Sequence, residues 1–395
     1  MTGKGRDWLE MRESGPGDEA QEEYVARLTR PIAPGESVTL DIEETLFGAM
    51  KPVPSAIREG EDQYMAFLDS FYFYSPYQTV DMKTEITLPM SKVTKISDQV
   101  QPASQSGKVI TLGPYSNVPP RSFEVFHVRF MQPHAIVSAR QLHKHFWVSQ
   151  WGKIRVLEEY VVANVGPKVN YEVRRLGESK PTFDGVTAHL PKQASDVFYR
   201  DDVGNITTSN LRRPGKGHRV LEMKFRFPLY GGWKIAFSYG YNLPLVNFLE
   251  QITGKQRYRV KLNFEPSIVD DMDVENYALS VTLPEGSSDI VMDLPRGLIL
   301  NSKDKRLTFP TLSYVGSPTL QYETKYIRAR SAEHPYLYIQ YTYPRWNLFR
   351  APIALIIVFM AMFAIALGYG RLEQLLRLQK TMSQPLQTDD FKKKN

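Results

Sequence analysis

The chain has 395 residues, which is long enough for two folded domains with additional segments. Its 49 Lys and Arg residues outnumber its 43 Asp and Glu residues, and much of the resulting +6 charge lies beside one apolar stretch near the C-terminus. Nucleic acid is therefore not an expected partner. The absence of Cys excludes disulfides, thiolate nucleophiles and Cys-ligated metals. The 22 Tyr and 20 Phe residues favour strand-rich structure.

Residues 1–23 are polar and rich in Gly and Glu. They lack the apolar core that a secretory signal peptide needs. We expect this segment to be disordered or not native to the fold.

The next part of the chain, residues 24–142, is assigned to a first β domain. Apolar and polar residues alternate from residue 37 onward, and Val38, Leu40 and Ile42 would share one face of a half-buried strand. Further strands are expected at residues 71–74, 84–88 and 122–130. Residues 97–120 are rich in Ser, Gly and Pro, which is typical of a loop.

Residues 143–342 are assigned to a second β domain because four longer runs alternate in the same way. The runs are Leu221, Met223, Phe225 and Phe227; Trp233, Ile235, Phe237, Tyr239 and Tyr241; Tyr258, Val260, Leu262 and Phe264; and Tyr277, Leu279, Val281 and Leu283. Gly231 and Gly232 separate the first two runs, which predicts a hairpin with Trp233 on the core face. Residues 245–252 are a short helix candidate. The predicted fold is mainly β: two antiparallel β-sandwich-like domains, the first truncated, followed by one transmembrane helix.

Residues 351–370 (APIALIIVFMAMFAIALGYG) form a run of twenty residues without a charge. This is the length that one helix needs to cross a bilayer, and a buried core helix is disfavoured because every face is apolar. Tyr343, Trp346 and Tyr369 are expected anchors at the membrane surface. Residues 343–370 are therefore assigned to a membrane-proximal segment and a transmembrane helix.

Charged residues on the two sides of this run predict its orientation. Arg345 and Arg350 precede it, whereas six cations follow it: Arg371, Arg377, Lys380, Lys392, Lys393 and Lys394. The positive-inside rule places the basic tail, residues 371–395, in the cytosol and the β region outside the cell or in a lumen.

Few side chains suggest chemistry. His143 and His145 would share one strand face, and His134 is near them in the sequence. No carboxylate stands near them to complete a metal site, and Lys144 and Arg140 make the segment positive, so both histidines are expected to face solvent.

Asp270, Asp271, Asp273 and Glu275 lack the EF-hand spacing, so a solvated loop is expected. Residues 212–219 (RRPGKGHR) lack the spacing of a phosphate-binding loop and indicate a basic hairpin loop, which would at most approach anionic headgroups or a pyrophosphate. Adjacent Asp201 and Asp202 would point to opposite strand faces, so no enzyme class stands out.

Asn205 begins the one N-x-[ST] sequon, Asn205-Ile206-Thr207, in a turn-like stretch between strands. A lumenal position would make it a glycosylation site.

Five stretches together resemble the ribophorin I family. They are residues 73–77 (FYSPY), 151–159 (WGKIRVLEE), 196–209 (DVFYRDDVGNITTS), 225–244 (FRFPLYGGWKIAFSYGYNLP) and 283–286 (LPEG), and they run in the family's order into a single span. The likeness covers about residues 24–370. Family members carry a cleaved signal peptide and a longer first domain, so the chain is interpreted as N-terminally truncated, by a partial gene model or a lost exon.

The resemblance implies a non-catalytic, lumenal, membrane-anchored subunit of the oligosaccharyltransferase complex. A catalytic polytopic subunit of that complex transfers a dolichol-linked oligosaccharide to asparagines of nascent chains. The implied partners are the catalytic and other membrane subunits, nascent polypeptides and membrane lipid. No cofactor, metal or catalytic residue is expected in this chain.

A single-span β-sandwich receptor or adhesion protein is the competing interpretation. The C-terminus helps to discriminate, because Lys392 and Lys393 stand fourth and third from the end and resemble the dilysine signal of endoplasmic-reticulum membrane proteins. A polybasic tail that only touches anionic lipid is the alternative for these lysines. The expected location is the endoplasmic-reticulum membrane, as a single-pass type I protein.

Overall fold

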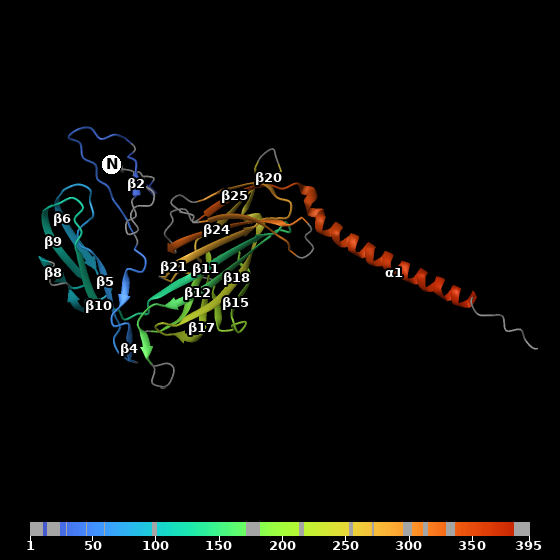
Figure 1. Cartoon of the computed structure of the whole chain (residues 1–395), viewed down its shortest axis with the longest axis horizontal. Helices are drawn as coiled ribbons and strands as arrows, with labels where there is room; N and C mark the ends of the chain where they lie inside the picture. The colour runs from blue at the N-terminus through green and yellow to red at the C-terminus, as the bar shows by residue number, and fades with distance from the viewer. Residues whose placement is uncertain are drawn as a thin grey trace, which may run out of the picture.

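The computed structural model describes residues 11–13, 24–28, 30–44, 46–58, 60–96, 101–170, 182–212, 217–252, 256–270, 272–294, 302–310, 315–328 and 336–382. These residues are mainly in β-strands, and the described chain ends in one long helix, α1 (Arg350–Met382), that extends away from the strands (Figure 1). The predicted fold class, mainly antiparallel sheets followed by one helix long and apolar enough to span a membrane, is therefore confirmed.

Two sheets form the first body, at the end of the molecule opposite α1 in Figure 1. One has the order β3 (Met50–Pro52), β5 (Tyr64–Ser70), β10 (Val125–Met131) and β7 (Val93–Ile96); the other has the order β6 (Thr79–Thr87), β9 (Val109–Val118) and β8 (Ala103–Ser106). Alternate residues of the strands point inward, as the period of a strand requires. Ile110 and Leu112 from β9 thus meet Phe126, Val128 and Phe130 from β10 in one small core.

Three sequence predictions fail in this first body. Residues 97–120 contain β8 and β9 rather than a loop. β8 is short and polar, and the Gly, Pro and Ser residues of β9 concealed the strand that carries buried Ile110 and Leu112. Val38, Leu40 and Ile42 lie in no strand and are about half exposed or more. Alternation alone does not make a strand, because the backbone also needs a paired neighbour. The segment 71–74 likewise follows strand β5 instead of forming one.

A larger sandwich follows, built around a seven-stranded sheet. In order of hydrogen-bonded neighbours it contains β15 (Ser195–Asp201), β18 (Lys234–Pro244), β12 (Lys153–Asn164), β11 (Val137–Val148), β21 (Asp273–Thr282), β24 (Ser317–Arg328) and β23 (Ser302–Thr308). All neighbours are antiparallel except β11 and β21, which are parallel.

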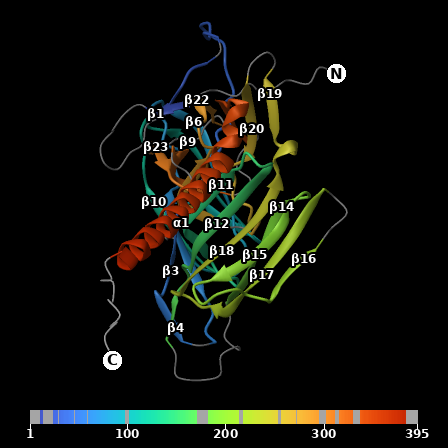
Figure 2. The same cartoon turned by 90° about the vertical axis from the view of Figure 1, so that its right-hand side faces the viewer.

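Two smaller sheets cover one face of this seven-stranded sheet (Figure 2). They are β14 (Phe183–Pro191), β17 (His218–Leu229) and β16 (Ser209–Arg212), and β19 (Leu249–Ile252), β20 (Arg257–Asn263), β25 (Tyr336–Thr342) and β22 (Ser288–Asp293). Leu221, Met223 and Phe225 from β17 and the alternating residues of β20 and β21 all enter one core, as predicted. Phe227, at the end of the first run, is exposed instead.

Short pairings join distant parts of the chain. β13 (Lys168–Asn170) pairs in parallel with β4 (Ala56–Arg58), and β1 (Met11–Glu13) pairs with β2 (Tyr24–Ala26). Residues 11–13 thus form a strand in a segment that was expected to lack structure; the rest of residues 1–23 lies outside the described residues. The division of the chain at residue 142 stays a prediction, and β11 begins at Val137.

The turn at Gly231 and Gly232 does not close a hairpin. β17 and β18 belong to different sheets, so the turn carries the chain from one layer of the sandwich to the other. Trp233 precedes β18, keeps 42% of its surface exposed and lies edge-on to Tyr230. The core prediction for Trp233 is therefore wrong, although Phe237, Tyr239 and Tyr241 of the same run are buried. The short helix expected at residues 245–252 is present only in its first residues: a 3-10 helix, η1 (Leu245–Asn247), leads into β19.

Gly231→Ala should destabilise the larger sandwich by about 3 kcal/mol, the upper part of the usual range for overpacking. A Cβ on Gly231 would lie 1.9 Å from the carbonyl oxygen of Pro167, which is backbone and cannot rotate away. Gly152→Ala is the matched control, because Gly152 also lies in a turn, with a φ of 88°, but has open space around it. Gly152→Ala should lower the stability of the sandwich only by the backbone strain of a Cβ at positive φ, about 1 kcal/mol. Equal shifts of the Tm in the two variants would contradict the close packing at Gly231.

Candidate functional site

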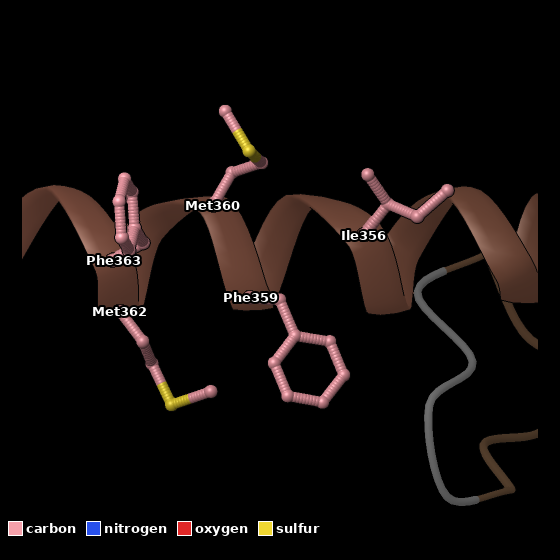
Figure 3. Close-up of a pocket in the computed structure, with 5 residues that line it drawn as sticks. All are labelled: Ile356, Phe359, Met360, Met362 and Phe363. Carbon is pink, nitrogen blue, oxygen red and sulfur yellow. The ribbon is translucent and has the colours of Figure 1, made fainter.

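Helix α1 has the properties of a membrane span. It begins at Arg350, one residue before the predicted run, and continues beyond Gly370 to Met382. The segment Arg345–Lys380 has a mean hydropathy of 2.6 in its most apolar window, and none of that window is buried by the rest of the described chain. Figure 3 shows Ile356, Phe359, Met360, Met362 and Phe363 pointing outward from different sides of the helix. The hollow between them is lined by this one helix, as expected for side chains that face lipid or other membrane helices.

A short 3-10 turn, η2 (Arg345–Phe349), connects the sandwich to α1. Asn347 is 2% exposed, and its Nδ2 donates a hydrogen bond to the carbonyl oxygen of Gly286 at 3.1 Å. Gly286 has a φ of 80°, and a Cβ there would lie 2.8 Å from the Arg350 guanidinium. The turn at residues 284–287 and the start of the helix are therefore closely packed.

Tyr343 is part of the sandwich rather than a membrane anchor. It is 7% exposed, and its hydroxyl donates to Oε1 of Gln150 at 3.4 Å. Burial raises the pKa of Tyr343 to about 12. Trp346 is 61% exposed beneath the Arg350 guanidinium and remains a candidate for the membrane surface.

Three of the five stretches that carry the family resemblance meet at this junction. Residues 283–286 contact η2, and residues 151–159 begin at the tip of the β11–β12 hairpin, next to Gln150. Residues 225–244 end beside the same tip, where the amide of Leu245 donates to the carbonyl of Gly152 at 2.9 Å. The end of the sandwich that leads into α1 is therefore the candidate functional site.

Apolar side chains are exposed at this end of the sandwich. Trp151 at the hairpin tip, Val246 in η1, and Trp346 and Phe349 in η2 are each more than 60% exposed. Aromatic residues of this kind are enriched where proteins meet a membrane surface.

Asn205 lies on a turn that polar contacts hold in place. Oδ1 of Asp201 accepts hydrogen bonds from the amides of Val203 and Gly204, both at 3.0 Å, and Arg226 pairs with both carboxylate oxygens at 2.8 and 3.0 Å. These bonds to Arg226 hold the pKa of Asp201 at about 2. Asn205 follows the turn and is exposed, as is Thr207. Asp201 is therefore a structural residue, and the sequon is accessible.

Lys392 and Lys393 lie outside the described residues. So do Asp271 and residues 213–216, although the flanking strands β16 and β17 do pair, as a hairpin requires. Asp270 accepts a hydrogen bond from the amide of Thr187 at 2.6 Å, and Glu275 contacts Ser138 and Arg140. Asp270 and Glu275 are thus engaged in holding strands together.

His143 and His145 do share one face of β11, but they are half-buried rather than facing solvent. Their ring centroids are 3.6 Å apart, and Nε2 of His145 lies 3.5 Å from Oε2 of Glu159. Sequence reasoning missed Glu159 because it lies sixteen positions further on, yet the register of β11 and β12 places it directly opposite His143. Burial lowers the pKa of His143 and lowers that of His145 to about 4. His134 is exposed and takes no part in this group.

Lys144 points to the opposite face of β11, into the core. Its Nζ lies 2.9 Å from Oε1 of Glu158, with the two side chains 1% and 0% exposed. Glu158 also accepts hydrogen bonds from the hydroxyls of Tyr160 at 2.8 Å and Tyr239 at 2.7 Å, and from Ser267. The sequence does contain a signal for this buried pair. Alternate residues of a strand share a face, and Lys144 stands two residues from buried Phe146. Glu158 likewise stands two residues from buried Tyr160.

Comparison with known proteins identifies the family. A model described as Ribophorin I matches residues 7–370. Dolichyl-diphosphooligosaccharide–protein glycosyltransferase subunit 1A of Arabidopsis thaliana is 29% identical over 355 residues, which cover 88% of this chain and 56% of that protein. Subunit 1B of Oryza sativa subsp. japonica is 31% identical over 273 residues, 67% of this chain and 57% of that protein. The chain thus spans little more than half the length of these curated relatives.

Among solved structures, an M1 zinc metallopeptidase from Deinococcus radiodurans matches 52% of this chain and 42% of its own, with 9% identity and a TM-score of 0.29. This likeness is too slight to establish a shared fold. The family model, in contrast, covers most of the chain, including all three stretches at the junction and the membrane-spanning run that follows them. The chain belongs to the ribophorin I family.

Proposed function

We propose that this chain is a non-catalytic subunit of the oligosaccharyltransferase complex, which transfers a dolichol-linked oligosaccharide to Asn in Asn-x-Ser/Thr of nascent chains. The family match from residue 7 to residue 370, which leads into a single span, carries the proposal. The plant relatives are named as subunit 1 of such a glycosyltransferase. Their names give no support to the alternative of a receptor or adhesion protein.

Two acidic residues of the described chain, Glu158 and Asp201, serve its own fold, which supports an accessory role. Glu158 is sealed between the two layers of the sandwich, where a substrate cannot reach it. Asp201 is paired with Arg226 and caps a turn. In this proposal a partner subunit performs the chemistry.

The proposed orientation puts the sandwiches in the lumen of the endoplasmic reticulum and the basic tail in the cytosol. The excess of cations after residue 370 supports it. Trp151, Val246, Trp346 and Phe349 would then touch the lumenal lipid surface. Small residues of α1, Ala361, Ala364 and Gly368, would let other membrane subunits pack closely against the helix.

Nascent polypeptides would approach from the lumenal side. Exposed aromatic side chains on the first body, Phe73, Tyr77 and Phe123, offer apolar contact area for unfolded chains. The function itself is tested by affinity purification from solubilised endoplasmic-reticulum membranes, which should recover the catalytic subunit with this chain.

Enzymatic removal of glycans tests the proposed orientation. The chain made in cells should carry one glycan, at Asn205, and Asn205→Gln should migrate like the deglycosylated protein. Asp184→Gln is a control on another exposed position. Protease added to sealed microsomes should remove only the basic tail that follows residue 370. Replacing Lys392 and Lys393 by Ser should let some protein leave the endoplasmic reticulum and acquire endoglycosidase-resistant glycan. A chain without glycan whose sandwiches are digested in sealed microsomes would contradict the orientation.

A further inference from the structure

His143, His145 and Glu159 converge on the outer face of the seven-stranded sheet, away from the core. β11 lies between β12 and β21 and is hydrogen-bonded to both, so its side chains have fixed directions. His143 and His145 are two residues apart and share a face, and Glu159 is the cross-strand neighbour of His143. One potential ligand atom from each of the three residues lies within 4.8 Å of the others.

One of these separations matches that of a metal site, and the others lie within 4.8 Å. Zinc binds His nitrogen and carboxylate oxygen at about 2.0–2.2 Å in a tetrahedron, which puts neighbouring ligand atoms roughly 3.3–3.5 Å apart. Nε2 of His145 and Oε2 of Glu159 are 3.5 Å apart. We propose that His143, His145 and Glu159 bind one Zn²⁺ ion, with a fourth position left for water.

Neighbouring side chains orient the two imidazoles. Nε2 of His143 is 2.9 Å from Oγ of Ser280 on β21, which leaves Nδ1 as the nitrogen for the metal. The ring of His145 stacks on Trp147, with centroids 5.0 Å apart and planes 8° apart. The contact of His143 with Ser280 is the kind of hydrogen bond that metal-binding histidines usually make with the second ring nitrogen, because it fixes the tautomer and the ring direction.

The charge around the group also suits a divalent cation. Glu159 is joined by Glu323 on β24, which lies in the same cross-strand row as His143, with Ala278 of β21 between them. The two cations that counted against a metal in the sequence are engaged elsewhere. Lys144 is in the core with Glu158, and Arg140 pairs with Glu275. Imidazole and carboxylate ligands without thiolate suit zinc, and the half-buried position limits competition from bulk water.

Zinc binding is measured on the full chain, purified in detergent without a histidine tag, by competition for ZnCl₂ with a chromophoric chelator. The wild-type protein should bind zinc at one ion per chain. His145→Gln and Glu159→Gln should each weaken binding by roughly tenfold or more. His127→Gln is the matched control, because His127 lies half-buried on β10 in the other body. It should bind as the wild type does.

The Tm provides a second measurement. A ligand that binds only the folded state stabilises it by mass action, so ZnCl₂ should raise the Tm of the wild type and of His127→Gln but not of the other two variants. Without zinc, all four proteins should melt alike, since the substituted side chains are partly exposed; if one variant misfolds, the other decides. Absence of stoichiometric zinc in the wild type, or equal affinity in His145→Gln, Glu159→Gln and the wild type, would overturn the proposal.

Discussion

Glu158→Gln should lower the stability of the larger sandwich by about 3–5 kcal/mol, because it leaves the Lys144 ammonium buried without a counter-charge. Both side chains are at most 1% exposed, so water cannot replace the lost partner. A loss of this size approaches the whole stability of a marginal domain, and it should lower the Tm by roughly 6–20 °C. Thermal unfolding followed by near-UV circular dichroism measures it.

Two further variants separate the charge from the shape of the side chain. Lys144→Met combined with Glu158→Gln removes both charges, keeps an oxygen that accepts the bonds from Tyr160 and Tyr239, and should recover much of the loss. Glu85→Gln breaks the exposed pair of Lys83 and Glu85 and should change the free energy of unfolding by less than about 1 kcal/mol. If the Tm of Glu158→Gln lies within a few degrees of the Tm of Glu85→Gln, the buried pair contributes little to the stability of the sandwich.

The same pair predicts a direction for the effect of pH. Burial by itself would raise the pKa of Glu158, but the Lys144 charge and the hydrogen bonds from Ser267, Lys144 and Tyr239 outweigh burial and hold this pKa below its usual value. The folded state therefore binds the proton less readily than the unfolded chain. The stabilisation is complete above the unfolded pKa, about 4.3 for Glu, and is lost as the pH falls through the folded pKa.

Periodicity predicted the strands that form the core of the larger sandwich. Val260, Leu262, Leu279 and Val281 are buried as their alternation indicated. The pattern does not specify which strand lies beside which, because a hairpin and a turn between layers both use small residues such as Gly231. Residues 38–42 alternate equally well but have no neighbouring strand in the described chain. Strand pairing depends on contacts between distant segments, which local sequence does not encode.

The membrane span and the sequon were predictable because each is a continuous motif. The span needs only length and hydropathy, and its helix begins within one residue of the expected position. The group around His143 was not predictable in full, because Glu159 reaches it through the register of the next strand. Lys144 and Arg140 were both counted as positive charges beside the histidines. Lys144 instead points into the core, because it alternates with His143 and His145 along the strand.

Assembly with the catalytic subunit tests the central claim most directly. An antibody against the sandwich should recover this chain from digitonin-solubilised endoplasmic-reticulum membranes together with that subunit. The recovered complex should transfer a lipid-linked oligosaccharide to an Asn-x-Thr peptide. The purified chain alone should show no transfer, because Glu158 is sealed in the core beside Lys144 and Asp201 is paired with Arg226. An unrelated single-span protein of the same membrane, purified in parallel, is the control. Recovery of this chain without the catalytic subunit, or transfer by the chain alone, would contradict its assignment as an accessory subunit.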